Sequence, residues 1–160
     1  MPAASFSVVP ASPDHIPHLA ENMRPADRRE VMAAYGHTPE QALRGSLKRS
    51  QIAWTLMIGD APAAMGGAAA ASIVSFTGRP WLLATPAMDS APRTLLARWS
   101  RLYVGEMLRL FPRLENWVHA ENRQSLRWLA WCGFAIDEPR ACGVAGELFH
   151  RFYKEGANYV

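Results

Sequence analysis

The hydrophobic and polar positions of this chain follow two periods, one typical of strands and one typical of helices. Short apolar runs bounded by turn residues predict strands at Ser5–Val9, Ile52–Ile58, Ala63–Phe76, Trp81–Thr85, Leu114–Val118, Phe134–Asp137 and Glu147–Tyr153. Apolar residues three and four positions apart predict helices at Asp14–Met23, Asp27–Tyr35, Pro39–Arg49, Pro92–Phe111 and in the segment after Asn122. Gly66-Gly67 predicts a bulge or bend, and Pro139–Gly143 predicts a loop.

The order of these elements predicts an α/β (α+β) fold. A first strand is followed by helices, three strands, a long helix, a strand, a helix and a final pair of strands, which indicates antiparallel pairing early and crossovers late. With 160 residues the chain is long enough to bury roughly two-thirds of the surface that its unfolded form exposes. We find no internal repeat and no linker, so residues 1–160 are expected to form a single domain.

The stretch NRQSLRWLAWCGF, residues 122–134, has a clear start and a clear stop. Asn122 is a suitable N-cap, because its side-chain oxygen can accept a hydrogen bond from an amide of the first turn. Gly133 lies where a left-handed residue ends a helix, and Phe134 is then placed to pack back on Leu129. The segment therefore predicts a short capped helix that turns directly into a strand.

This stretch resembles the last helix of the GNAT family of N-acetyltransferases, which starts at an Asn and closes in Gly-Phe. The order of the predicted elements is similar to the GNAT fold over nearly the whole chain, while the specific likeness is limited to this stretch, the strand Trp81–Thr85, the helix Pro92–Phe111 and the strand Leu114–Val118. The resemblance implies a GNAT-like central mixed twisted sheet of about six to seven strands with helices on both faces. More closely, the chain is similar to the acetyltransferase-like internal virion proteins of short-tailed phages, which share these features.

The resemblance implies acetyl-CoA as the cofactor. In the family it lies in a V between two splayed parallel strands, here Trp81–Thr85 and Leu114–Val118, whose free peptide groups bind the pantetheine arm. The pyrophosphate rests on the N-terminus of the next helix, where unpaired amides and the helix dipole favour anions. The cofactor-binding residues implied in this way are Leu83, Ala84, Thr85, Ser90, Arg93, Thr94 and Asn122.

The segment before the long helix departs from the family pattern. The family loop is rich in glycine, whereas Thr85–Thr94 contains none. Pro86 and Pro92 lack an amide hydrogen, and Asp89 adds a negative charge where a phosphate would lie. The interpretation is a degenerate pyrophosphate loop that relies on Arg93, Ser90 and the amides of the helix end.

Candidate catalytic groups are few. Many family members carry a Tyr seven residues after the Asn, where its hydroxyl can protonate the leaving thiolate, but that position is Leu129. His119, at the end of the strand beside the splay, is the first candidate for the general base, and Glu121 is the second. The alternative interpretation is an ordinary strand-end histidine and a solvated glutamate before a helix cap.

Composition and charge narrow the classes of partner. The net charge is +3 and the isoelectric point is near 9.2, but the arginines are scattered in a way typical of solvated helix faces rather than of a nucleic-acid surface. Ala64–Phe76 is the nearest approach to a membrane span and is too short, and no secretory signal is evident, so a cytoplasmic protein is expected. His15 and His18, and Cys132 and Cys142, form no recognisable metal or redox spacing, so no metal site is predicted.

Two functional hypotheses remain open at this point. The first is a phage-type GNAT-fold protein that acts as an acetyl-CoA-dependent N-acetyltransferase. The second is a non-catalytic virion or host-takeover protein that keeps the fold and binds a host or virion protein, which the missing glycines and Leu129 favour. A nucleic-acid-modifying acyltransferase is a weaker third, supported by the basic charge alone. Trp128 and Trp131 cannot both face inward with Leu129, so one of them is expected to cover the groove or a partner surface.

Overall fold

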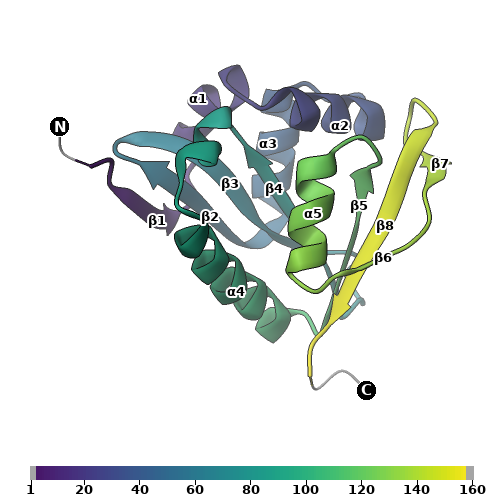
Figure 1. Ribbon diagram of the computed structural model, residues 1–160. Helices are drawn as coiled ribbons and strands as arrows, with labels where there is room; N and C mark the ends of the chain where they lie inside the picture. The colour runs from purple at the N-terminus through teal and green to yellow at the C-terminus, as the bar shows by residue number, and fades with distance from the viewer. Residues whose placement is uncertain (1–2, 158–160) are drawn as a thin grey trace.

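A computed structural model describes residues 3–157, which fold around one eight-stranded sheet (Figure 1). The strands lie in the order β1-β2-β3-β4-β5-β8-β6, and β7 pairs with β8. The strands are β1 (Phe6–Pro10), β2 (Ser50–Ile58), β3 (Ala61–Ala70), β4 (Thr77–Ala84), β5 (Arg113–His119), β6 (Ala135–Ile136), β7 (Arg140–Cys142) and β8 (Glu147–Glu155). The helices are α1 (Ile16–Glu21), α2 (Pro25–Tyr35), α3 (Pro39–Arg49), α4 (Arg93–Leu110) and α5 (Arg123–Trp131), with short 3-10 turns η1 (Pro13–His15) and η2 (Pro86–Ser90).

Helices cover both faces of the sheet, as expected. One apolar cluster joins α1, α2 and α3 to β3 and β4 through Met65 and Leu83. The other joins α4 and α5 to β5 and β8, with Val104, Leu129 and Phe152 among its buried members. Figure 1 shows α4 and α5 side by side on the near face of the sheet. The predicted α/β (α+β) fold is confirmed, with eight strands in place of six or seven.

The predicted end of the third strand and the predicted start of the fourth are wrong. Ala63–Phe76 is not one strand, because β3 ends at Ala70 and a hairpin turn follows, closed by a hydrogen bond from the Ala71 amide to the Thr77 carbonyl. The next strand therefore begins at Thr77 and not at Trp81. The prediction extended the strand too far because Ile73 and Val74 favour strands, but in the structure both side chains are exposed at the tip of the turn.

The predicted loop Pro139–Gly143 contains a strand. Residues 140–142 form β7, which pairs antiparallel with β8. Gly143 and Gly146 both adopt positive φ angles, 74° and 65°, which let the chain fold back over a tight turn. Short polar strands of this kind are fixed by the partner strand, so their own residues indicate them poorly.

Gly66 and Gly67 do not form a bulge. Both pair in regular register with β2 and β4, and the irregularities of the β2–β3 pair lie elsewhere. A Cβ atom at Gly66 would lie 2.8 Å from the carbonyl oxygen of Trp81, and one at Gly67 would lie 2.1 Å from that of Ile52. The glycines are therefore required by the close approach of neighbouring backbones.

The predicted caps of α5 are confirmed. The Asn122 side-chain oxygen accepts a hydrogen bond from the Ser125 amide at 3.4 Å. At the other end Gly133 has φ 85°, and the Phe134 amide bonds to the Leu129 carbonyl at 3.1 Å, which is a Schellman closure. These local bonds begin α5 beside the end of β5 and stop it before β6.

Replacing Gly133 with alanine is expected to destabilise the fold by about 1–2 kcal/mol, because the positive φ disfavours any Cβ. The added methyl would also lie 2.7 Å from the Lys154 Nζ, which donates to the Cys132 carbonyl. Urea unfolding measures the loss. Gly105→Ala is the matched control, since Gly105 is helical with nothing near its Cβ position, and it should be neutral or stabilising. Equal effects of the two substitutions would contradict the role of the Gly133 conformation.

Candidate functional site

The two parallel strands β4 and β5 part shortly after they meet. They pair only at Thr77 with Arg113 and at Gly78 with Leu114. Two residues further along both strands, the side-chain amide of Asn116 spans the gap and donates to the Pro80 carbonyl at 2.9 Å. Beyond this link no pairing between β4 and β5 occurs within the described residues. The sheet therefore has a V-shaped opening where the sequence predicts one.

The peptide groups that face this opening come from alternate residues of β4. The Ala84 amide donates to Asp27 and its carbonyl accepts from the Arg24 amide, so both point away from β3. Because peptide groups of a strand alternate in direction, those of Leu82 face the same opening. The Leu82 side chain is 38% exposed. Leu82 is the position that sequence reasoning missed, and only the register of β4 on β3 identifies it.

A buried carboxylate closes the end of the V. Asp27 of α2 is 1% exposed, and its carboxylate accepts hydrogen bonds from the Ala84 amide and from the Asn122 side chain. Arg24 forms a bidentate ion pair with it, with Nε at 3.1 Å and Nη2 at 3.0 Å from Oδ2. The charge of Asp27 is thus compensated inside the protein, and the carboxylate ties α2 to β4.

A second carboxylate, one helical turn along α2, ties the same helix to β5. Glu30 Oε2 accepts from the His119 amide at 2.8 Å and from the Asn122 side chain at 3.1 Å. Desolvation raises the pKa of Glu30 from 4.5 to about 7, and the nearby Asp27 charge adds to the rise. The Asn122 side chain bridges both carboxylates, so α2 and the start of α5 together hold the parted strands. The sequence indicated neither acid, since they lie about 90 residues from Asn122.

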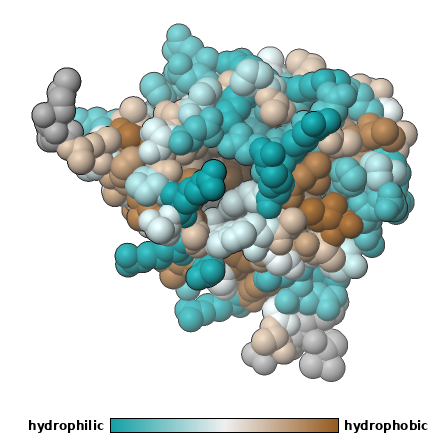
Figure 2. Space-filling model, viewed as in Figure 1, coloured by the Kyte–Doolittle hydropathy of each residue, from teal (hydrophilic) through white to brown (hydrophobic). Residues whose placement is uncertain are grey.

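A pocket of about 450 Å³ lies on the face of the sheet that carries α4 and α5. Its floor is the small-residue stretch of β3 with Leu82 and Ala84 of β4. Its walls come from β2, α4, η2 and the start of α5. Figure 2 shows hydrophilic side chains around a hollow on this face whose depth is hydrophobic. The pocket therefore adjoins the V and gives it access to solvent.

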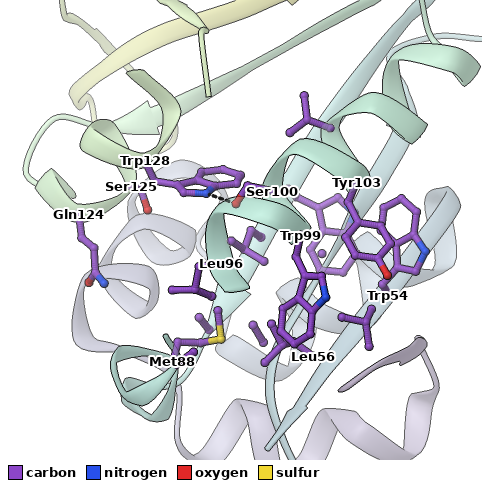
Figure 3. A pocket seen from close by; sticks show the side chains of 18 of the residues that line it. Trp54, Leu56, Met88, Leu96, Trp99, Ser100, Tyr103, Gln124, Ser125 and Trp128 are labelled. Carbon is purple, nitrogen blue, oxygen red and sulfur yellow. Dashed lines mark hydrogen bonds between the residues drawn. The ribbon is translucent and has the colours of Figure 1, made fainter. Parts of the chain in front are cut away.

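Two side-chain bridges cross this pocket. The Trp128 indole reaches from α5 to α4 and donates to the Ser100 hydroxyl at 2.8 Å (Figure 3). Gln124, at the start of α5, donates to Asp89 of η2 at 2.9 Å. Trp128 is thus the tryptophan that covers the groove, whereas Trp131 is 50% exposed outside the pocket. A ligand that runs between α4 and α5 has to displace the indole.

The segment before α4 contains the 3-10 turn η2 and leads into the exposed start of the helix. Pro92 is the N-cap and provides no side-chain cap, while Arg93 and Thr94 form the exposed first turn. Arg93 lines the pocket, whereas the Ser90 hydroxyl donates to the Ala87 carbonyl. Asp89 also lines the pocket. Both charges that the sequence singled out, Arg93 and Asp89, therefore line the same pocket.

The two predicted catalytic residues lie together at the end of β5. His119 is 3% exposed, with Nε2 2.9 Å from Glu147 and Nδ1 accepting from the Glu121 amide at 3.2 Å. The Glu121 side chain is exposed and forms an ion pair with Arg29. Neither residue lines the pocket. Their catalytic assignment stays a prediction.

The remaining predicted cofactor residues are buried. Leu83 faces the opposite side of the sheet, in the cluster of α1 and α3. Thr85 returns to β3, where its amide and hydroxyl both donate to the Ala63 carbonyl. Asn122 is 2% exposed, and its side chain is engaged by Ser125, Asp27 and Glu30. A direct contact of these three residues with a cofactor stays a prediction.

The described residues form neither a metal-binding cluster nor a membrane-spanning helix. Within residues 3–157 no group of three His, Cys, Asp or Glu side chains is arranged to hold a metal ion. His15 lies 2.9 Å from the Thr55 hydroxyl through Nδ1, which accounts for its position on the sheet. Over the same residues no helix has the length and apolar character needed to cross a bilayer.

Known proteins resemble this chain in structure. No protein-family model matches the sequence, and no curated protein matches it either. Among solved structures, a probable acetyltransferase of the GNAT family from Chromobacterium violaceum aligns with a TM-score of 0.69 at 15% identity, over 96% of this chain and 91% of that one. YncA from Salmonella typhimurium, named as a candidate acetyltransferase and solved with acetyl-CoA, aligns with a TM-score of 0.67 at 12% identity, over 97% and 96%.

A third solved structure aligns with this chain over a similar length. The ribosomal-protein-S5-alanine acetyltransferase from Vibrio fischeri aligns with a TM-score of 0.63 at 12% identity, over 97% of this chain and 95% of that one. The likeness in each case extends over nearly the whole of both chains, and at these identities it establishes the fold. The protein therefore has the GNAT fold, with the parted strands β4 and β5 at its centre.

Proposed function

We propose that this protein is an acetyl-CoA-dependent N-acetyltransferase. The observation that carries the proposal is the opening between β4 and β5, which presents free peptide groups of Leu82 next to the uncapped start of α4. An extended amide-containing arm can pair with such groups as a strand would. The positive end of the α4 dipole, together with Arg93, suits the phosphates of the same ligand. One of the similar structures was solved with acetyl-CoA.

Acetyl-CoA supplies an activated acyl group as a thioester. In the transfer, the amine nitrogen forms a bond to the acyl carbon, the carbon–sulfur bond breaks, and the amine loses a proton while the thiolate gains one. The Leu82 amide would donate to the carbonyl oxygen as negative charge develops there. His119 or Glu121 would accept the proton through water, as the sequence predicts. Leu129 is buried in the core, so the thiolate would take its proton from solvent.

The alternative is a non-catalytic GNAT-fold protein that binds another protein in a virion or in a host cell. The bond from Trp128 to Ser100 favours it, because the indole covers the groove that a pantetheine arm needs. The absence of glycine from the loop before α4 favours it as well. The phage context itself rests on the sequence resemblance.

Acetyl-CoA at 100 times its dissociation constant is expected to stabilise the protein by about 2.7 kcal/mol, which raises the melting temperature by roughly 5–10 °C. A thermal-shift titration measures this. Arg93→Ala should reduce the shift, because Arg93 lines the pocket at the start of α4. Arg98→Ala is the matched control, since Arg98 is an exposed arginine of the same helix outside the pocket.

Trp128→Ala separates the two functions. In an enzyme, removal of the indole opens the groove, and acetyl-CoA should bind this variant at least as tightly as the wild type. If neither protein responds to millimolar acetyl-CoA, the acetyltransferase proposal fails and the binding alternative stands. A response that Arg93→Ala and Arg98→Ala reduce equally would refute the phosphate position.

A further inference from the structure

A pocket lies between the first half of α4 and the sheet. None of its residues from Arg93 to Tyr103 is fully buried, whereas Val104 and Met107, further along the same helix, are. The apolar stripe of this half consists of Leu96, Trp99 and Tyr103, which all line the pocket. A stripe of large apolar side chains normally packs on the sheet directly, because protein interiors are close-packed. Here space remains beneath it.

The floor beneath α4 is kept clear by small residues. Ala64, Gly66 and Gly67 line the pocket, and a Cβ atom at either glycine would collide with the backbone of a neighbouring strand. Gly66 shares the α4 face with its partners Trp54 and Leu82, so no side chain can rise from this position to meet the helix, whereas Gly67 faces the other side of the sheet. The clear floor therefore follows from the close approach of β4 to β3 at Gly66.

Aromatic side chains form the far wall of this space. The rings of Trp54 and Tyr103 lie with centroids 4.3 Å apart and planes tilted by 51°. Trp99 and Leu56 lie beside them, on the opposite side of α4 from Gln124 and Trp128 (Figure 3). We call the part of the pocket lined by Trp54, Leu56, Trp99 and Tyr103 the aromatic chamber.

The size of the pocket exceeds what the transferred acetyl group needs. A cavity of about 150 Å³ lined by apolar side chains accepts benzene. The pocket here measures about 450 Å³, within the range of sites for small organic ligands. An acetyl group next to Leu82 cannot also reach Trp54 on β2 across the glycine floor. The chamber is thus the part of this pocket that an acetyl group at Leu82 leaves unfilled, and its aromatic and aliphatic lining suits a group that is flat and apolar.

We propose that the aromatic chamber binds a ring-sized apolar group carried by one of the two substrates of the transfer. This inference rests on the proposed function only for the reaction in which the group takes part. The group belongs either to the acceptor amine, as in an arylalkylamine, or to the acyl part of a thioester. Flat aromatic groups fit best, since Trp54, Tyr103 and Trp99 offer ring faces and edges for stacking.

Tryptophan fluorescence of the intact protein tests the chamber, because Trp54 and Trp99 lie in its walls. The probes are 2-phenylethylamine with ethanolamine as its polar counterpart, and phenylacetyl-CoA with acetyl-CoA as its small counterpart. We expect a saturable change with one aromatic probe at a concentration at least tenfold lower than with its counterpart. A response to the amine assigns the group to the acceptor, and a response to the thioester assigns it to the acyl donor.

Substitutions locate the response. Leu56→Trp should fill the chamber and weaken binding of the aromatic probe at least tenfold. Trp131→Ala should leave this binding unchanged, since Trp131 lies outside the pocket. Melting curves establish that both variants fold. If Leu56→Trp does not fold, the melting temperature of the wild type replaces this test. A rise with 2-phenylethylamine that ethanolamine does not produce, or a rise with phenylacetyl-CoA larger than that with acetyl-CoA, supports the chamber.

The outcomes for the two proposals are distinct. If acetyl-CoA stabilises the protein but neither aromatic probe exceeds its counterpart, the chamber inference is overturned and the proposed function stands. If 2-phenylethylamine binds but no thioester does, the chamber stands and the acetyltransferase proposal fails. If Leu56→Trp and Trp131→Ala weaken binding of the aromatic probe equally, the chamber inference is also overturned.

Discussion

Asp27→Ala is expected to destabilise the protein by about 3–5 kcal/mol, which is the usual cost of removing one partner of a buried ion pair. Asp27 is 1% exposed, and the Arg24 side chain that pairs with it is 12% exposed. The substitution would leave the Arg24 guanidinium without its carboxylate, and the Ala84 amide and the Asn122 side chain without an acceptor. Chemical denaturation with circular dichroism measures the free energy of unfolding.

Two further variants make this result specific. Asp14→Ala removes an exposed carboxylate from η1 and should change the free energy of unfolding by less than about 0.5 kcal/mol. Asp27→Asn keeps an acceptor for the Ala84 amide but loses the charge. Its loss of stability should therefore fall between those of Asp14→Ala and Asp27→Ala. If Asp27→Ala is as mild as Asp14→Ala, the buried carboxylate does not hold β4, and the description of the closed end of the V is wrong.

Glu30→Gln is expected to stabilise the protein at pH 8 by up to about 3 kcal/mol, the free energy that corresponds to the rise of the Glu30 pKa from 4.5 to about 7. The partly buried carboxylate lies near Asp27, with Arg24 as the nearby cation and with His119 and Asn122 as donors. Glutamine can accept the same two hydrogen bonds without a charge. Its stabilisation therefore measures what ionisation of Glu30 costs the fold.

The direction of the pH dependence follows from the raised pKa. Between pH 4.5 and 7 the folded state holds a proton on Glu30 that the unfolded state has lost, so wild-type stability falls as the pH rises through this window. The advantage of Glu30→Gln should disappear below pH 4.5. Melting temperatures of both proteins from pH 4 to 8 provide the measurement. Glu138→Gln, at an exposed loop position, should follow the wild type. A constant offset between Glu30→Gln and wild type at all pH values would rule out ionisation as the cause.

Much of the fold could be predicted from local patterns. The caps of α5 follow from Asn122 and Gly133, since capping bonds join residues that are close in sequence. The long helix α4 follows from its apolar stripe. The failures occurred where a neighbouring strand decides the structure, as at β7 and at the start of β4.

The site was predicted less completely. The strands that part and the helix that follows them were identified. Arg93 lines the pocket, and its contact with a phosphate stays a prediction. Leu82 was missed, because the direction of its peptide groups depends on the register between β3 and β4. Asp27 and Glu30 were missed because an acid three residues from another on a helix is typical of a solvated face. Only the packing of α2 against the end of β5 buries them.

The sequence by itself determined the succession of elements, the two ends of α5, and the lack of glycines and of two amide hydrogens in the segment before α4. These depend on hydrogen bonds and periodicities within one or two helical turns. The tertiary structure alone decided that two carboxylates of α2 would close the V, that the Trp128 indole would cover the groove, and that space would remain under α4. Each of these arises from groups that are distant in sequence, and burial changes what a side chain can do only once the chain has brought them together.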